Sequence, residues 1–132
     1  MPTWQEVQTY VRSKYKVAKD EATFFDMVWA YDDSRTQIIR VRHFTAFDKD
    51  WIEFRSPICA EANINHRVAL LKNSDFAVGA IALEQGKDSA LYVMVYSVPL
   101  GTMDMEEFEL PLTVIARTAD GLEQTYSGGD QY

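Results

Sequence analysis

Residues 76–100 have the sequence FAVGAIALEQGKDSALYVMVYSVPL, and this stretch decides the fold because it predicts a β-hairpin. Phe76–Glu84 and Ala90–Val98 are rich in the β-branched, aromatic and other apolar residues that strands favour. They flank the polar connection 85–89, in which Gly86 can supply the positive φ that such a turn often needs. The centre of the chain is therefore predicted to be a pair of antiparallel strands.

The second predicted strand is apolar on both faces. Successive side chains of a strand point to opposite sides, so Leu91, Val93 and Val95 share one face. The opposite face carries Tyr92, Met94, Tyr96 and Val98. Tyrosine and methionine suit interfaces, because tyrosine is amphipathic and methionine repacks against varied shapes. This face is a candidate dimer or partner surface. Three alternatives remain for what covers it: a helix of the same chain, a second copy, or a client segment.

The composition bounds the class of protein. With 132 residues, 47% of them hydrophobic, the chain suits one globular domain, predicted at 1–126 with a flexible tail at 127–132. The formal charge of −7 disfavours nonspecific attraction to nucleic acid or to anionic membranes. Cys59 is the single cysteine, which excludes an internal disulfide, and no signal peptide or membrane span is expected. We therefore expect a cytoplasmic protein.

Capping residues and periodicity predict the other elements. Thr3 and Glu6 have the spacing of a capping box, and Trp4, Val7 and Val11 follow at helical spacing. The predicted elements in chain order are a helix at Pro2–Lys14, strands at Phe24–Tyr31, Thr36–Phe47 and Trp51–Ser56, a helix at Asn63–Lys72, the hairpin, and a helix that starts at Asp104. The order is thus helix, three strands, helix, two strands, helix.

Two details of these elements set expectations for the packing. Phe47 is predicted to point inward at the end of its strand, before a polar turn at 48–50. Asn63 is predicted to cap the second helix, with Ile64, Val68 and Leu71 on its buried side.

The last helix combines a clear start with a helix breaker. Asp104 and Glu107 have capping-box spacing. One apolar stripe follows them: Phe108, Leu112, Ile115, Ala119 and Leu122. Pro111 removes a hydrogen bond and clashes with the preceding turn at a cost of roughly 3 kcal/mol. We therefore expect a kink at Pro111, or a helix that begins near Leu110.

Five segments together carry a resemblance to a known family. They are Leu70-Leu71-Lys72-Asn73, the Phe76–Leu83 strand, Glu84-Gln85-Gly86, Val98-Pro99-Leu100 and the helix start Asp104-Met105-Glu106-Glu107-Phe108. In these segments and in the order of its elements, the chain resembles the bacterial YbjN-like proteins of the type III secretion chaperone-like superfamily. Pro111 departs from the uninterrupted last helix that is usual there.

The resemblance implies a fold and a mode of action. It implies an α+β fold with a five-stranded antiparallel sheet in the order α-β-β-β-α-β-β-α, commonly in a homodimer, with no enzymatic activity and no cofactor. The secretion relatives bind extended segments of client proteins and keep them soluble, whereas YbjN-like members are loosely labelled as regulators. The partners implied are therefore a second copy of the chain and an unidentified client protein.

The residues that catalysis or metal binding needs are scattered. His43 and His66 have no second ligand at a spacing of three or four, so no zinc motif is present. Cys59 and His66 could pair as nucleophile and base, but no orienting third group is evident, and a buried structural thiol is the favoured interpretation. We expect no catalytic, cofactor or metal site.

Arg40 and Arg42 are predicted on the outer face of the sheet, beside Asp26, Glu53 and Arg55. Such a face can hold an acidic segment or nucleic acid, or it can be a solvated face with cross-strand ion pairs of roughly 0.2–1 kcal/mol each. The strongly negative total charge makes nucleic acid the weaker reading.

Three hypotheses of function follow. The first is a non-enzymatic, homodimeric chaperone-like or adaptor protein that binds a partner protein through apolar sheet or helix surface. The second is a small-ligand-binding domain or enzyme with a pocket between sheet and helices, for which no convergent polar set is visible. The third is a nucleic-acid-associated regulator that uses Arg40, Arg42 and Arg55.

Overall fold

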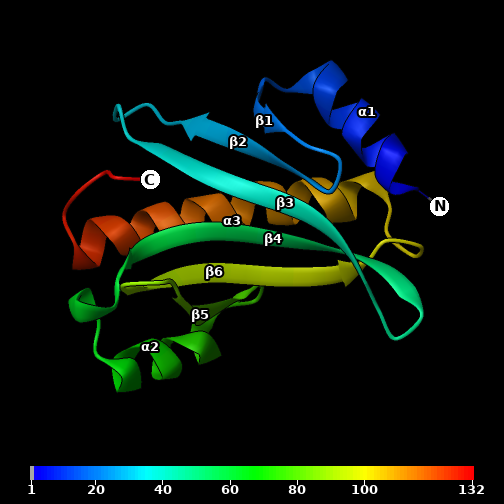
Figure 1. Cartoon of the computed structure of the whole chain (residues 1–132). Coiled ribbons are helices and arrows are strands. Elements are labelled where there is room, and N and C mark those ends of the chain that lie inside the picture. The colour runs from blue at the N-terminus through cyan, green and yellow to red at the C-terminus, as the bar shows by residue number, and fades with distance from the viewer. Residues whose placement is uncertain (1) are drawn as a thin grey trace.

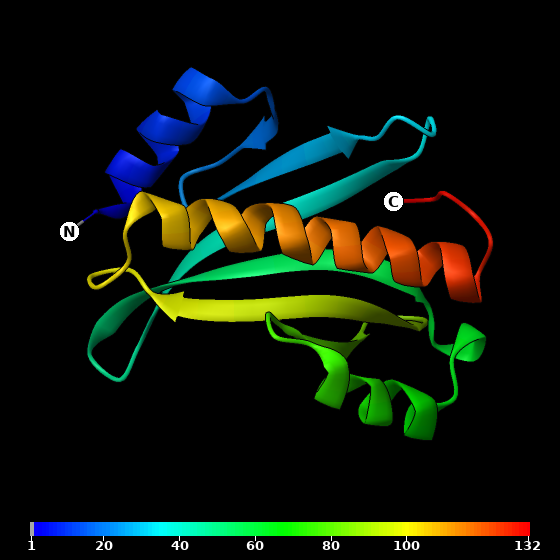
Figure 2. The same ribbon diagram turned by 180° about the vertical axis from the view of Figure 1, so that it is seen from behind.

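The computed structural model describes residues 2–132 as an antiparallel sheet with helices against one face (Figure 1). The sheet has six strands in the order β1-β2-β3-β4-β6-β5. The elements in chain order are α1 (Trp4–Lys14), β1 (Val17–Asp20), β2 (Phe24–Ala30), β3 (Thr36–Ala46), β4 (Lys49–Ala60), a 3-10 turn (Glu61–Asn63), α2 (His66–Lys72), a second 3-10 turn (Asn73–Asp75), β5 (Ala80–Gln85), β6 (Ala90–Pro99) and α3 (Met105–Tyr126). Figure 2 shows α3 running along the sheet, with α2 at the margin beside β5.

The sheet contains one strand more than the five that were expected. The additional strand, β1, pairs antiparallel with β2, from Val17 opposite Met27 to Asp20 opposite Phe25. Its side chains are exposed except for the half-buried Val17, so it lacks the apolar alternation by which a sequence pattern predicts a strand. The α+β class and the antiparallel arrangement are confirmed, and the number of strands is corrected to six.

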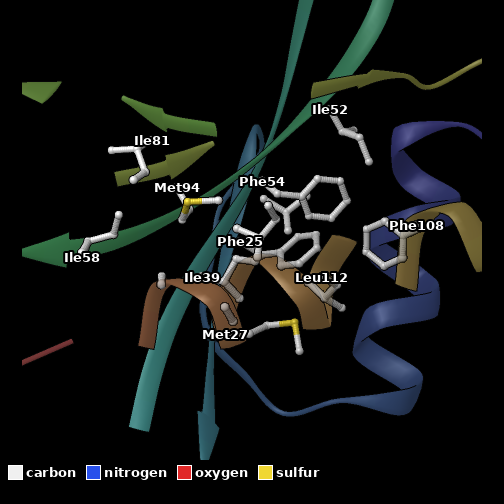
Figure 3. Close-up of a cluster of buried hydrophobic side chains, with 14 of the residues drawn as sticks. Phe25, Met27, Ile39, Ile52, Phe54, Ile58, Ile81, Met94, Phe108 and Leu112 are labelled. Carbon is white, nitrogen blue, oxygen red and sulfur yellow. The ribbon is translucent and has the colours of Figure 1, made fainter. Parts of the chain in front are cut away.

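Helix α3 supplies the main cover of the inner face of the sheet. Its capping box is present: Asp104 accepts from the Glu107 N–H, and the Glu107 carboxylate accepts from the Asp104 N–H. The predicted apolar stripe is buried along its whole length: Phe108, Leu112, Ile115, Ala119 and Leu122. The Phe108 and Phe54 ring centroids are 5.7 Å apart, and Figure 3 shows Leu112 close to the side chains of the sheet.

Pro111 does not split α3, and the alternative of a helix that begins near Leu110 is wrong. The helix begins at Met105 and continues through Pro111 to Tyr126. The proline ring is buried and lines a hollow together with Tyr96 and Val98 of the sheet. Its apolar contacts therefore offset part of the cost of the lost hydrogen bond.

Glu109 on α3 ties α1 to the rest of the molecule. Its carboxylate accepts from the Tyr10 hydroxyl at 2.7 Å, the Tyr15 hydroxyl at 2.6 Å and the Lys14 ammonium at 2.7 Å. The hydrogen bonds from Lys14, Tyr15 and Tyr10 lower the pKa of Glu109 to about 2. The stability that this carboxylate contributes is present above pH 4.5 and is lost as the pH falls through about 2. The predicted apolar stripe of α1 is buried: Trp4, Val7 and Val11.

The β3–β4 hairpin turns earlier than predicted. Phe47 and Asp48 both have positive φ, 53° and 60°, and Ala46 lies opposite Lys49, so the connection is a two-residue turn. Phe47 is 89% exposed at the tip of the hairpin, and the prediction that it points inward is wrong. Strand β4 consequently begins at Lys49 and continues past Pro57.

Helix α2 buries a different face from the one predicted. Asn65 rather than Asn63 is its N-cap, and Ala69 is its buried residue. Val68 and Leu71, predicted to be buried, are exposed. The small Ala69 is the residue that α2 turns to the sheet, so its larger apolar side chains face away.

The segment 127–132, expected to be flexible, is hydrogen-bonded to α3 and to β3. The Gln131 N–H donates to the Glu123 carboxylate at 2.7 Å, and the Ile38 N–H donates to the Tyr132 carbonyl at 2.9 Å. Figures 1 and 2 show the segment turning back from the end of α3 toward the start of β3. These contacts favour a docked segment over a frayed one.

Gly79 lies where the chain enters β5, which begins at Ala80 rather than at Phe76. The φ of Gly79 is +87°, and a Cβ at this position would lie 2.5 Å from Ile115 Cδ1 and 3.1 Å from the Val95 carbonyl oxygen. Both the backbone conformation and the close approach of α3 therefore require glycine.

Gly79→Ala should lower the free energy of unfolding by roughly 1–3 kcal/mol, because it adds backbone strain and overpacking against α3. Gly121→Ala is the matched control: this glycine lies inside α3, and a Cβ there would have no neighbour within 4 Å. That variant should gain up to about 1 kcal/mol from helix propensity. Urea denaturation measures both values, and an unchanged stability of Gly79→Ala would contradict the close packing at β5.

Candidate partner-binding surfaces

The chain's own helices cover much of the hairpin face that the sequence marks as a candidate partner surface. Met94 is fully buried, and Tyr92 is buried with its hydroxyl donating to the Ile64 carbonyl at 3.0 Å (Figure 3 shows Met94). Tyr96 and Val98 are half-buried beside α3. In a single chain Tyr92 and Met94 are too buried to contact a partner. That Tyr96 and Val98 contact a second copy or a partner protein stays a prediction.

Four large apolar side chains are exposed where α2 lies beside β5. We call them the α2–β5 patch: Val68, Leu70, Leu71 and Leu83. Leu70 is 70% exposed and Leu71 is 58% exposed. Single exposed apolar residues are normal on protein surfaces, whereas a cluster of them marks an interaction site. The sequence contains the signal, two adjacent leucines on a short helix, but the pattern predicts Leu71 to be buried.

A hollow of about 230 Å³ lies behind the patch, between α2 and the β5–β6 hairpin. Its lining is largely apolar: His66, Ala69, Leu70, Ile81, Ala82, Leu83 and Tyr92. Small-molecule sites usually have volumes of roughly 300–1,000 Å³. The hollow therefore suits one or two apolar side chains of another protein better than a cofactor.

Strand β5 is an edge strand of the sheet, and one of its residues is already capped. The Asn73 side chain accepts from the Ile81 N–H at 2.7 Å and donates to the Ile81 carbonyl at 3.3 Å. This pair of bonds blocks strand addition at Ile81. Leu83, two residues on, is outside this cap and belongs to the α2–β5 patch.

The outer face of the sheet carries arginines that are paired with carboxylates on neighbouring strands. Arg40 Nε and Nη2 donate to the two oxygens of Asp26 at 2.7 and 2.9 Å. Glu53 accepts from Arg42 at 2.9 Å and from Arg55 at 3.0 Å. Burial acts to raise the pKa of Glu53, but the hydrogen bonds from Arg42 and Arg55 outweigh it and lower that pKa. The three arginines are thus engaged within the sheet, which argues against a nucleic-acid interface.

A groove of about 190 Å³ lies among these ion pairs, and we call it the outer groove. Its apolar lining residues are Ile38, Pro57, Leu91 and Val93. Its charged lining residues are Asp26, Arg40, Arg55 and Glu84. The Arg55 guanidinium donates to Glu84 at 2.7 Å, so the charged lining is internally neutralised. The groove can therefore take an apolar side chain without selecting strongly for either sign of charge.

The candidate catalytic residues have separate partners. Cys59 is buried, and burial, with a smaller effect of Glu123, raises the pKa of its thiol. His66 Nε2 lies 2.8 Å from a Glu61 carboxylate oxygen, and His43 Nε2 lies 3.0 Å from Asp50. Within residues 2–132 no hydrogen bond joins Cys59 to either histidine. A thiol kept neutral by burial is a weak nucleophile.

A carboxylate cluster that the sequence analysis missed lies at the end of α3. Asp120, Glu123 and Asp130 each place an oxygen within 4.8 Å of the others. Arg35 Nε donates to Asp120 at 2.9 Å, and Arg35 Nη2 lies 3.5 Å from Glu123. Because the guanidinium supplies the compensating positive charge, we assign the cluster to an ion-pair network. Asp120 and Glu123 share a helix face, which is a visible signal, whereas nothing in the sequence places Asp130 beside them.

Solved structures provide the comparison that decides the fold. A chain in the "Structure of the HopA1-SchA Chaperone-Effector Complex" superposes with a TM-score of 0.62 at 12% identity, over 88% of each chain. A chain in the "Crystal Structure of the ExsC-ExsE Complex" gives 0.60 at 10% identity, over 96% of this chain and 97% of that one. The chain shares its fold with these two chains.

At these identities the likeness concerns the fold alone. No family model and no curated protein matches the sequence. The narrower YbjN-like assignment therefore stays a prediction. Among the helices described in residues 2–132, none has the length and apolar character needed to cross a bilayer.

Glu53→Gln should lower the free energy of unfolding by roughly 1–3 kcal/mol at pH 7, because Arg42 and Arg55 lose a shared, largely buried anion. Glu84→Gln is the matched control and should cost less than about 1 kcal/mol, since Glu84 is exposed and its side chain is hydrogen-bonded, within residues 2–132, to Arg55 alone. Because the folded-state pKa of Glu53 lies below 4.5, the wild-type advantage is present above that pH and disappears as the pH falls through the folded pKa. Denaturation curves at several pH values measure the free energy of unfolding of both variants. Equal losses in the two variants would contradict the role of Glu53 as the shared partner of Arg42 and Arg55.

Proposed function

We propose that this protein is a non-enzymatic, cytoplasmic chaperone-like or adaptor protein that works as a homodimer and binds a partner protein. The α2–β5 patch is the observation that carries the proposal. Full burial of a leucine side chain contributes roughly 1.5–3 kcal/mol, and Leu70 and Leu71 leave most of this contribution unused in the single chain. A protein surface that covers the patch recovers it.

A second copy of the chain suits the patch on electrostatic grounds. The net charge of −7 makes two copies repel each other over most of their surface. The four members of the patch carry no charge, so two copies meet there with the least repulsion. A two-fold axis brings the same patch of both chains together, which is the commonest arrangement in homodimers.

The outer groove is the surface that we assign to a client segment. An extended segment can place an apolar side chain beside Leu91 and Val93 while its polar groups meet Arg55 and Glu84 at the rim. One of the structures with the same fold is described as a chaperone–effector complex, which supports a protein as the client. Dimerisation and client binding then use different surfaces, α2–β5 and the outer groove.

Replacing Leu70 and Leu71 together by aspartate should turn the dimer into a monomer without unfolding it, because both side chains are exposed in the single chain. Light scattering after gel filtration at micromolar concentration measures the mass, and circular dichroism checks the fold.

Leu110→Asp is the control for this experiment. Leu110 is also an exposed leucine, 55% exposed, but it lies on α3 outside the patch, so the variant should stay dimeric. A monomeric wild-type protein would remove the dimer from the proposal. A double variant that stays dimeric would show that the copies meet elsewhere.

A further inference from the structure

Pro57 interrupts the pairing of β3 with β4 near the middle of the sheet. The two strands pair in regular register from Arg40 opposite Arg55 to Ala46 opposite Lys49. Beyond Arg55, proline has no N–H to donate, and β4 has a register shift after Pro57 in its pairing with β6. The backbone groups at the start of β3 therefore need other partners.

Side chains satisfy the carbonyl groups on both sides of this gap. The Ser56 hydroxyl donates to the Ile38 carbonyl, and the Gln37 amide donates to the Pro57 carbonyl at 2.6 Å. The N–H groups of Thr36 and Ile38 face the same side of β3 and point away from β2. We call the position between them and β4 the β3–β4 notch.

The segment after α3 fills the notch with three consecutive residues. The Thr36 N–H donates to the Asp130 carboxylate at 3.1 Å, and the Ile38 N–H donates to the Tyr132 carbonyl at 2.9 Å. Between these two contacts, the Gln131 N–H donates to the Glu123 carboxylate at 2.7 Å. The contact at Ile38 is the backbone bond that an added strand would make with β3, and at Thr36 the Asp130 side chain takes the place of a backbone carbonyl.

We call the contact between the Gln131 N–H and the Glu123 carboxylate the latch, because it holds this segment in the notch. Two buried polar atoms beside the latch lack a hydrogen bond within residues 2–132. Glu123 is fully buried, its Oε1 has no hydrogen-bond partner among residues 2–132, and neither has the facing Arg35 Nη2. Asp120 and Asp130 also face the site and add negative charge to it. Burial raises the pKa of Glu123 and also the pKa of the neighbouring Tyr132 hydroxyl. The Glu123 carboxylate keeps the Gln131 N–H and the facing Arg35 guanidinium, but the missing hydrogen bond at its Oε1 weakens the docked state relative to a fully bonded one.

We propose that the β3–β4 notch is a second binding site, which takes an extended peptide of a partner protein, and that residues 130–132 occupy it in cis as a built-in competitor. The contacts define the peptide: an acidic residue for the Thr36 N–H, then a residue with a free N–H for Glu123, then a residue whose carbonyl accepts from the Ile38 N–H. The site is separate from the α2–β5 patch and from dimerisation. The assignment of a peptide to this site rests on the proposed function in one respect, namely that the partner is a protein.

Gln131→Pro in the 132-residue chain tests the latch, because proline removes the N–H that donates to the Glu123 carboxylate. Gln131→Ala is the matched control and keeps that N–H. Amide exchange of Thr36 and Ile38, measured by NMR, should be at least tenfold faster in Gln131→Pro than in Gln131→Ala. Equal exchange rates in two folded variants would overturn the latch.

Peptide binding tests the notch itself. A fluorescent, amidated peptide of the sequence SGGDQY should bind Gln131→Pro at least tenfold more tightly than wild type in an anisotropy titration, and the scrambled peptide QGYGSD should not. Equal affinity for wild type and variant, or equal binding of the scrambled peptide, would overturn the proposal. If Gln131→Pro does not fold, Asp130→Ala, which removes the acceptor for Thr36, serves for both measurements with the same expected outcomes. Both variants leave Leu70 and Leu71 intact, so the mass measured by light scattering reports on dimerisation independently.

Discussion

The packing of α3 against β4 and β6 is the interaction on which the rest of the structure depends. Phe108, Leu112 and Ile115 enter the inner face of the sheet, and the chain approaches them so closely at Gly79 that no side chain fits there. Because α3 and α1 both lie on this one face, the opposite face of the sheet stays open to solvent. The short helix α2 is left at the margin beside β5, with a single alanine turned inward. One covered face, one open face and one uncovered helix follow from the same packing.

The open surfaces differ in how their polar groups are satisfied. On the outer face, Glu53 and its two arginines neutralise one another, so the face is stable in water while still offering an apolar groove. The α2–β5 patch has no such compensation, because Leu70 and Leu71 face solvent directly. At the β3–β4 notch, the chain supplies its own partner from the segment after α3. Because the three surfaces differ in this way, we assign a client segment to the outer groove and a second copy of the chain to the α2–β5 patch. To the β3–β4 notch we assign a peptide that competes with residues 130–132.

The elements that bury an apolar stripe could be predicted from the sequence, and the others could not. The stripe of α3 follows its helical period even through Pro111, because burial of the ring offsets the lost hydrogen bond. Strand β1 has no apolar alternation, so periodicity could not reveal it. Phe47 and Leu71 were misplaced for one shared reason: apolar identity predicts burial, but a residue at a hairpin tip or on an uncovered helix face has nothing to be buried against. The notch depends on backbone N–H groups, which a residue pattern does not display.

The central claim is that α3 closes the inner face of the sheet while α2 and β5 meet a second copy. Hydrogen–deuterium exchange at nanomolar and at high micromolar protein concentration tests this claim most directly, because it reports on each element within the intact chain. The account predicts that exchange in α2 and β5 slows as the concentration rises, while exchange in α3 and β4 is slow at both concentrations. Exchange in α2 and β5 that does not change with concentration, or fast exchange in α3, would contradict it.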